Sequence, residues 1–141
     1  MGSLDTAPLD LRAILRPSSP NDAFACAPGT CAASADFASP VYPIDRTALL
    51  QTAEAVLLAE PRTAVAARDD ALAQIVFVQR SAVFGFADTI RVQAEGTDGE
   101  TSLIVHSRSN TGYYDFGVNR KRVRRLLDGI AHRLSAGASS T

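Results

Sequence analysis

The sequence predicts an α+β domain in which an antiparallel sheet of four to five strands carries two helices on one face, behind a Pro-rich N-terminal arm. Two segments place apolar residues at spacings of three and four, which is typical of amphipathic helices. Between them lie four short runs of β-branched and apolar residues with short connections, which favours an antiparallel meander. A run of strands flanked by helices is typical of the α+β class.

The 141 residues divide into an irregular Pro/Ala/Ser-rich arm (1–40), a single α+β domain (41–134) and a disordered tail (135–141). Five of the seven prolines lie in the arm. Proline removes a backbone donor and fixes φ, so a long helix or a central strand is not expected there. The tail consists of small and polar residues and is expected to fray.

The first helix is predicted over 46–60, with Asp45 as its N-cap and Pro61 as its stop. Strands are predicted over 63–68, 71–80, 89–94 and 101–107, with a hairpin connection at 96–99. In the third of these strands, Arg91 and Gln93 alternate with apolar residues and belong to the other face. The second helix is predicted over 119–134.

Charge and hydropathy exclude two classes of protein. The net charge is −1, which argues against a general nucleic-acid-binding protein. No stretch approaches the roughly 20 apolar residues of a membrane span, and no signal peptide is recognisable in the first 15 residues. Six basic residues and one acidic residue lie within 118–133. We interpret this cluster as the solvated face of the last helix, with an acidic partner or anionic lipid headgroups as alternatives.

Two cysteines bracket a short turn. Cys26 and Cys31 flank Pro28-Gly29, a pair that favours a tight turn and brings the two sulfurs close. In an oxidising compartment we expect a disulfide, and in a cytosolic protein two free thiols. A metal site is not expected, because no second cysteine pair or nearby histidine completes four ligands.

Two segments carry a family resemblance. Residues 107–123 read S-R-S-N-T-G-Y-Y-D-F-G-V-N-R-K-R-V, and residues 80–88 read R-S-A-V-F-G-F-A-D. Together they resemble the domain of unknown function 1499 family over about residues 16–134, with Asn110 where many members have arginine. The resemblance implies no activity. It implies that some members are bacterial and attached to or exported across the inner membrane, and that others are plastid proteins.

The same segments supply the candidate binding residues, which are Arg80, Asp88, Arg108, Asp115, Asn119 and Arg120. We expect Asn119 to cap the last helix and Asp115 to pair near its positive end. An anion site is the alternative, although Asp115 would repel an anion. A hydrolytic triad is disfavoured, because His106 and Ser107 are neighbours on a strand and point to opposite faces. Five of the nine aromatic residues lie at 84–86 and 113–116, so we expect them to meet at one end of the sheet.

These observations favour a non-enzymatic binding or accessory domain, associated with an envelope or membrane. The alternatives are a small carrier of lipids or hydrophobic ligands, and a small hydrolase or isomerase with Asp88 or Asp115 as base. No catalytic residue, metal or cofactor is predicted. The expected partner is a protein or a small molecule, not nucleic acid, with an anionic membrane surface facing the basic helix as a further option. A membrane-anchored or periplasmic native protein with an upstream segment is favoured over a cytoplasmic one.

Overall fold

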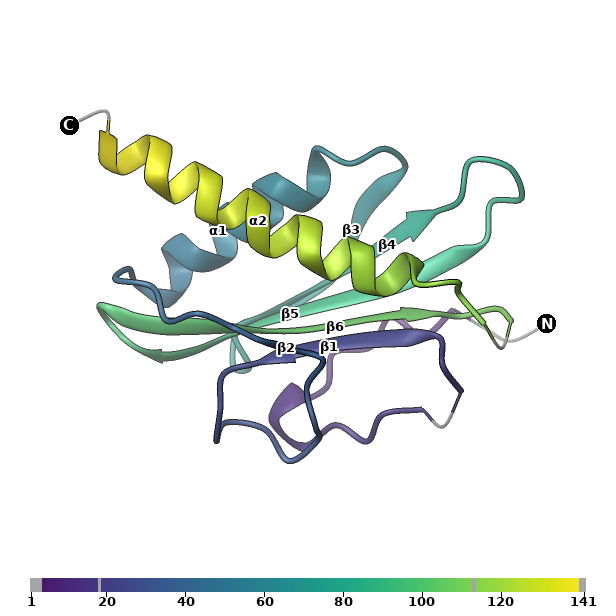
Figure 1. Cartoon of the computed structure of the whole chain (residues 1–141), viewed down its shortest axis with the longest axis horizontal. Helices are drawn as coiled ribbons and strands as arrows, with labels where there is room; N and C mark the ends of the chain where they lie inside the picture. Colours follow the sequence, from purple (N-terminus) through teal and green to yellow (C-terminus); the bar gives the residue numbers. More distant parts are fainter. Residues whose placement is uncertain (1–3, 18, 113, 140–141) are drawn as a thin grey trace.

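Two helices cross one face of a six-stranded sheet, and the N-terminal segment covers part of the other face (Figure 1). The computed structural model describes residues 4–17, 19–112 and 114–139. The helices are α1 (Arg46–Leu58) and α2 (Val118–Ser139), and a short 3₁₀ helix, η1 (Leu11–Ala13), lies in the N-terminal segment. The strands are β1 (Asp22–Cys26), β2 (Phe37–Ala38), β3 (Thr63–Asp69), β4 (Gln74–Arg80), β5 (Ala87–Thr97) and β6 (Glu100–Ser109), in the order β2-β1-β6-β5-β4-β3.

The α+β class is confirmed, and the four predicted strands are found as β3 to β6, but the sheet is larger than predicted and is mixed. β1 and β2 pair in parallel, whereas all other neighbours are antiparallel. Both additional strands come from the first 40 residues, where no central strand was expected. β1 is nevertheless an interior strand, since it pairs with β6 on its other side. Pro20 and Pro28 flank β1 without entering it, so its backbone donors remain free to pair.

The start of α1 agrees with the prediction, whereas the end of α2 does not. Asp45 caps α1 as predicted, because its side chain accepts a hydrogen bond of 2.7 Å from the backbone N–H of Ala48. α2 continues through Ser139, so residues 135–139 lie in a helix that was expected to end at 134. Residues 140 and 141 lie outside the described residues.

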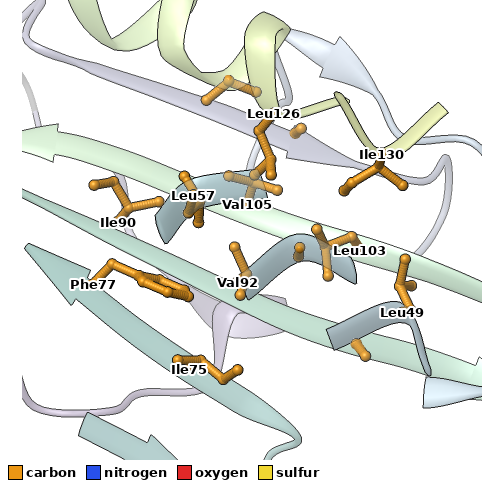
Figure 2. Close-up of a cluster of buried hydrophobic side chains, with 14 of the residues drawn as sticks. Leu49, Leu57, Ile75, Phe77, Ile90, Val92, Leu103, Val105, Leu126 and Ile130 are labelled. Carbon is orange, nitrogen blue, oxygen red and sulfur yellow. The ribbon is translucent and has the colours of Figure 1, made fainter. Parts of the chain in front are cut away.

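The main core lies between the helices and the sheet. Figure 2 shows part of this core, whose buried side chains come mostly from both helices and from β1, β4, β5 and β6. The labelled members are Leu49, Leu57, Ile75, Phe77, Ile90, Val92, Leu103, Val105, Leu126 and Ile130. The alternation predicted for residues 89–94 therefore selects the correct face of β5 for the core.

The opposite face of the sheet is also covered. Arg91 and Gln93 are 1% and 0% exposed, because residues 5–14 pass over them. Gln93 accepts a hydrogen bond of 2.9 Å from the backbone N–H of Leu11. Arg91 donates to the carbonyl of Ala7 at 2.8 Å and pairs with the Asp5 carboxylate at 3.1 Å. Burial lowers the pKa of Arg91, and the nearby Asp5 charge opposes that shift.

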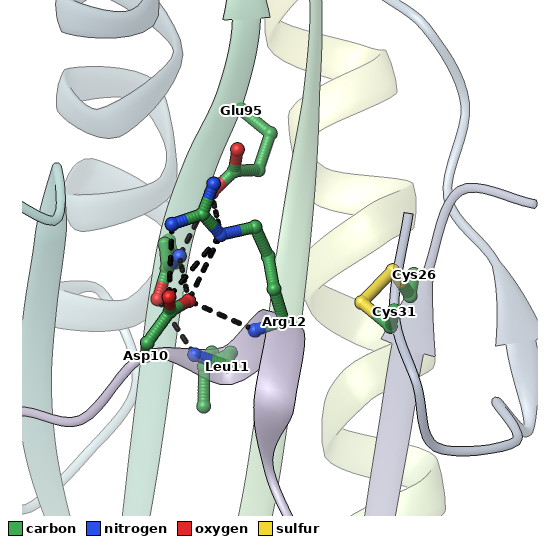
Figure 3. Close-up of a disulfide and its surroundings, with 7 residues drawn as sticks. Asp10, Leu11, Arg12, Cys26, Cys31 and Glu95 are labelled. Atoms are coloured by element: carbon green, nitrogen blue, oxygen red, sulfur yellow. Dashed lines mark hydrogen bonds and ion pairs between the residues drawn. A yellow bond between two sulfur atoms is a disulfide. The ribbon is translucent and has the colours of Figure 1, made fainter. Parts of the chain in front are cut away.

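A second apolar cluster holds the arm against the sheet. Its buried members are Leu11, Ile14, Phe24, Cys26 and Ile104. Cys26 and Cys31 form a disulfide in this region with a Cα–Cα distance of 6.5 Å, which confirms the expected proximity of the two residues (Figure 3). Beside this cluster, Asp22 lies 2.9 Å from both His106 Nε2 and Arg16 Nε. Burial raises the pKa of Asp22, but the hydrogen bonds with His106 and Arg16 outweigh it, so the net shift is downward.

We predict that Leu11→Ala lowers the free energy of unfolding by about 2–5 kcal/mol, because Leu11 is fully buried and its removal leaves a cavity under the sheet. The matched control is Leu15→Ala, four residues away, since Leu15 is 92% exposed. Urea denaturation of both variants is the measurement. Equal stability of the two variants would show that the arm does not form part of the folded unit.

We predict that the folded protein, prepared without reductant, contains no alkylatable thiol after denaturation. The reason is that both cysteines are consumed in the Cys26–Cys31 bridge. Mass spectrometry after iodoacetamide treatment is the measurement, with a reduced sample as the control that takes up two labels. Two labels on the non-reduced sample would reject the disulfide.

Candidate functional site

A buried arginine joins α2 to the ends of three strands. Arg122 is 5% exposed and lies in the first turns of α2. It donates to Gln79 Oε1 on β4 at 2.6 Å and to Asp88 Oδ2 on β5 at 2.8 Å. It also donates to Ser107 Oγ on β6 at 3.0 Å and to Asn119 Oδ1 at 2.6 Å. A buried charge is tolerated when it is paired and fully hydrogen-bonded, and Arg122 meets both conditions.

Asn119 extends this network to β1. It is fully buried, and its amide nitrogen donates to the carbonyl of Asn21, to Ser109 Oγ and to Asp115 Oδ2. Its amide oxygen accepts from Ser107 and from Arg122. Asn119 therefore lies inside the helix and does not cap it as expected. Asp115 takes that role, because it accepts from the backbone N–H groups of Gly117 at 2.9 Å and of Asn119 at 3.1 Å.

A pocket of about 420 Å³ opens beside this network, between the β4–β5 loop and the loop that precedes α2. Both loops lie at the same end of the sheet in Figure 1. Asp88, Ser109 and Arg122 contribute polar groups to its lining. The remaining lining residues are Arg62, Gln79, Arg80, Ser81, Phe86, Thr111, Gly112, Tyr114, Asp115, Phe116, Val118 and Arg125. We call this the aromatic pocket.

The aromatic residues of the pocket are unusually exposed. Phe86, Tyr114 and Phe116 are 52%, 64% and 89% exposed. Phe84 stacks on Phe86 at a centroid distance of 5.4 Å, and Tyr114 stacks on Phe116 at 6.3 Å. The expected meeting of these aromatic residues at one end of the sheet is therefore found for the described members, and Tyr113 lies outside the described residues. Exposed apolar clusters of this kind mark binding sites.

The backbone at the pocket mouth is also unusual. Phe116 has φ of 54°, in the left-handed region that a bulky residue rarely adopts. Gly117 follows with φ of 80°, where glycine is tolerated without strain. Asp115 holds this turn in place through its hydrogen bond to Gly117. The strain therefore presents an aromatic ring to solvent, and such strain is concentrated at functional sites.

Two arginines lie on the β3–β4 side of the pocket. Arg62 precedes β3, and its Nε donates to the carbonyl of Arg80 at 2.9 Å. Arg80 ends β4, and its Nη1 donates to the carbonyl of Gly85 at 3.1 Å. The backbone N–H of Arg80 donates in turn to the carbonyl of Arg62. Both side chains are exposed, so each presents further donors at the pocket.

The structure brings four of the six candidate residues together and separates two. Arg80, Asp88 and Asp115 line the pocket, and Asn119 lies directly behind Asp115. Arg108 faces the N-terminal arm, because Ser107 and Ser109 point to α2 and alternate residues point to opposite faces. Arg120 pairs with Asp36 at 3.1 Å, away from the pocket.

Sequence reasoning placed Arg122 in the solvated basic cluster, although it is the centre of the network. The sequence did contain an indication that Arg122 is buried, because Asn119, Arg122 and Leu126 share one helical face with the apolar stripe. Part of the basic cluster is also engaged in local contacts. Arg120 pairs with Asp36, and Arg124 lies over the ring of Phe37.

Arg125 of the same cluster pairs with the Glu60 carboxylate. Its Nη2 donates to Oε1 at 2.9 Å, and its Nε donates to Oε2 at 3.0 Å. Burial raises the pKa of Glu60, and the hydrogen bonds from Arg125 and Gln79 reverse the shift, so the net direction is downward. This pairing reduces the cationic surface that α2 could offer to an acidic partner or an anionic membrane.

The arrangement does not favour a hydrolytic site. Ser107 Oγ donates to Asn119 and faces α2, whereas His106 faces the arm and contacts Asp22. Within residues 4–17, 19–112 and 114–139, no group of three or more His, Cys, Asp or Glu side chains is placed to hold a metal ion. None of the helices in the same ranges has the length and apolar character needed to cross a bilayer.

We predict that Asp115→Ala lowers the free energy of unfolding by about 2 kcal/mol, because it removes the acceptor of two backbone N–H groups and one partner of buried Asn119. Asp128→Ala is the control, since Asp128 is an exposed carboxylate on the same helix. Thermal denaturation of both variants is the measurement. A fully stable Asp115→Ala protein would contradict the architectural role.

The sequence profile of a family described as "Protein of unknown function (DUF1499)" matches residues 15–130. The match includes both signature segments and therefore the residues of the Arg122 network and the aromatic pocket. No curated protein and no solved structure matched the chain. Because the profile covers most of the sequence, this protein belongs to the DUF1499 family.

Proposed function

We propose that this protein is a non-enzymatic binding domain whose ligand occupies the aromatic pocket. The observation that carries the proposal is the combination of three exposed aromatic side chains with a polar network whose groups are already hydrogen-bonded. The volume of about 420 Å³ lies within the range of small-molecule sites. A mostly apolar lining with a few fixed polar groups is the usual composition of such sites.

The two alternative functions receive less support. A carrier of the kind considered above would have an apolar cavity under α2, but Val123, Leu126 and Ile130 fill that position as core residues. A hydrolase or isomerase would need a free carboxylate as base. Asp88 is paired with Arg122, and both oxygens of Asp115 accept hydrogen bonds.

The proposed location is outside the cytoplasm, either periplasmic or tethered to a membrane. The Cys26–Cys31 disulfide supports an oxidising compartment, because cytosolic thiols are usually kept reduced. The compensated charges of α2 give weaker support to direct contact between that helix and anionic lipid. In this proposal, recognition therefore depends on the pocket and not on the helix surface.

We predict that the neutral fluorescent probe N-phenyl-1-naphthylamine binds the pocket, and that Phe116→Ala weakens its binding about tenfold. The basis is the loss of an aromatic contact whose burial by the probe contributes about 1.5–3 kcal/mol. Fluorescence titration of the wild-type and variant proteins is the measurement.

The control for this titration is Leu15→Ala, which removes an exposed apolar side chain from the arm, away from the pocket. It should bind the probe with wild-type affinity. Equal affinity of the Phe116→Ala and wild-type proteins, or the absence of any probe binding, would contradict the proposed function. A thermal denaturation curve of each variant establishes that it is folded.

A further inference from the structure

We propose that the ligand of the aromatic pocket is an amphipathic anion, with a carboxylate or phosphate head bound by Arg62 and Arg80 and an apolar body against the aromatic residues. This inference rests on the proposed function and adds the chemical class of the ligand. It follows from the balance of charges around the pocket, from the position of the two arginines and from the nature of the opposite wall.

The charges that line the pocket do not cancel. Arg122 is paired with Asp88, and Arg125 with Glu60. In the part of the chain that the structure describes, Arg62 and Arg80 have no carboxylate partner; each donates only to a backbone carbonyl. Two guanidinium groups on one pocket therefore lack a counter-charge.

The two arginines are neighbours in the sheet, and both line the pocket. The carbonyl of Arg62 accepts from the backbone N–H of Arg80, while the side chain of Arg62 donates to the carbonyl of Arg80. These reciprocal bonds join the start of β3 to the end of β4. A guanidinium group retains several N–H donors in a planar arrangement, which matches the oxygens of carboxylates and phosphates.

Asp115 does not prevent anion binding at this position. It belongs to the loop before α2, whereas the two arginines belong to the β3–β4 side. Its carboxylate accepts from the N–H groups of Gly117 and Asn119 at the start of α2, where the helix dipole stabilises negative charge. The anionic head is therefore expected beside Arg62 and Arg80, and the apolar body beside Phe86, Tyr114 and Phe116.

The test is displacement of N-phenyl-1-naphthylamine by matched amphiphiles below their micelle concentrations. Dodecanoate, dodecanol and dodecyltrimethylammonium share one chain and differ in the charge of the head. We expect dodecanoate to displace the probe at a concentration about tenfold lower than dodecanol, because only the anion offers a charged acceptor that forms an ion pair with the guanidinium groups. The cationic amphiphile should be the weakest competitor.

The variant that tests the assignment is the double substitution Arg62→Gln and Arg80→Gln. It should remove the preference for dodecanoate over dodecanol, with each displacement referred to the probe affinity measured for the same variant. Arg133→Gln is the matched control, since Arg133 is an exposed arginine near the other end of α2 and should retain the preference.

The outcomes separate this inference from the proposed function. Equal displacement by dodecanoate and dodecanol, with probe binding still sensitive to Phe116→Ala, would overturn the anionic head and leave the pocket function standing. Failure of all three amphiphiles to displace a bound probe would also overturn the inference. Failure of the probe itself to bind would contradict both proposals. Sedimentation with phosphatidylglycerol vesicles, without displacement by free dodecanoate, would assign the anion to a bilayer surface and overturn the free amphiphile as ligand.

Discussion

The burial of one guanidinium group organises the end of the sheet that carries the aromatic pocket. Removing the charge of Arg122 from water is costly unless every donor finds a partner and a carboxylate balances the charge. Asp88 supplies the carboxylate, and Gln79, Ser107 and Asn119 supply further acceptors. These partners come from three neighbouring strands and from the helix itself. The first turns of α2 can therefore lie in only one position and register against the sheet.

The hydrogen bonds around Arg122 also determine which groups of the pocket remain accessible. Asp88 and Asn119 are both hydrogen-bonded to Arg122, so these polar groups beside the pocket hold the structure. Asp115 holds the turn that exposes Phe116 in a left-handed conformation. Within the described residues, the accessible groups of the pocket include aromatic rings and two arginines without carboxylate partners. The proposed binding function rests on this combination of a fixed polar support and an accessible apolar mouth.

The other face of the sheet depends on the N-terminal segment. Arg91 and Gln93 would face water in a two-layer domain, but residues 5–14 cover them and supply backbone groups as hydrogen-bonding partners. The apolar cluster around Leu11 holds the same segment near β1, and the Cys26–Cys31 disulfide joins the end of β1 to the loop that follows it. The described part of the first 40 residues thus forms a third layer and two strands of the sheet, and the helices form the other outer layer (Figure 1).

The sequence alone determined the features that depend on near neighbours. Several features arise from interactions over a few residues. They are the Asp45 cap, the apolar stripes of both helices, the four predicted strands (β3 to β6) and the turn between the cysteines. It also located the two segments that form the pocket. Only the tertiary structure decided that β1 is an interior strand, that Arg108 faces the arm and that Arg122 is buried. Each of these depends on a partner far along the chain, and the sequence pattern around a residue does not specify which distant surface covers it.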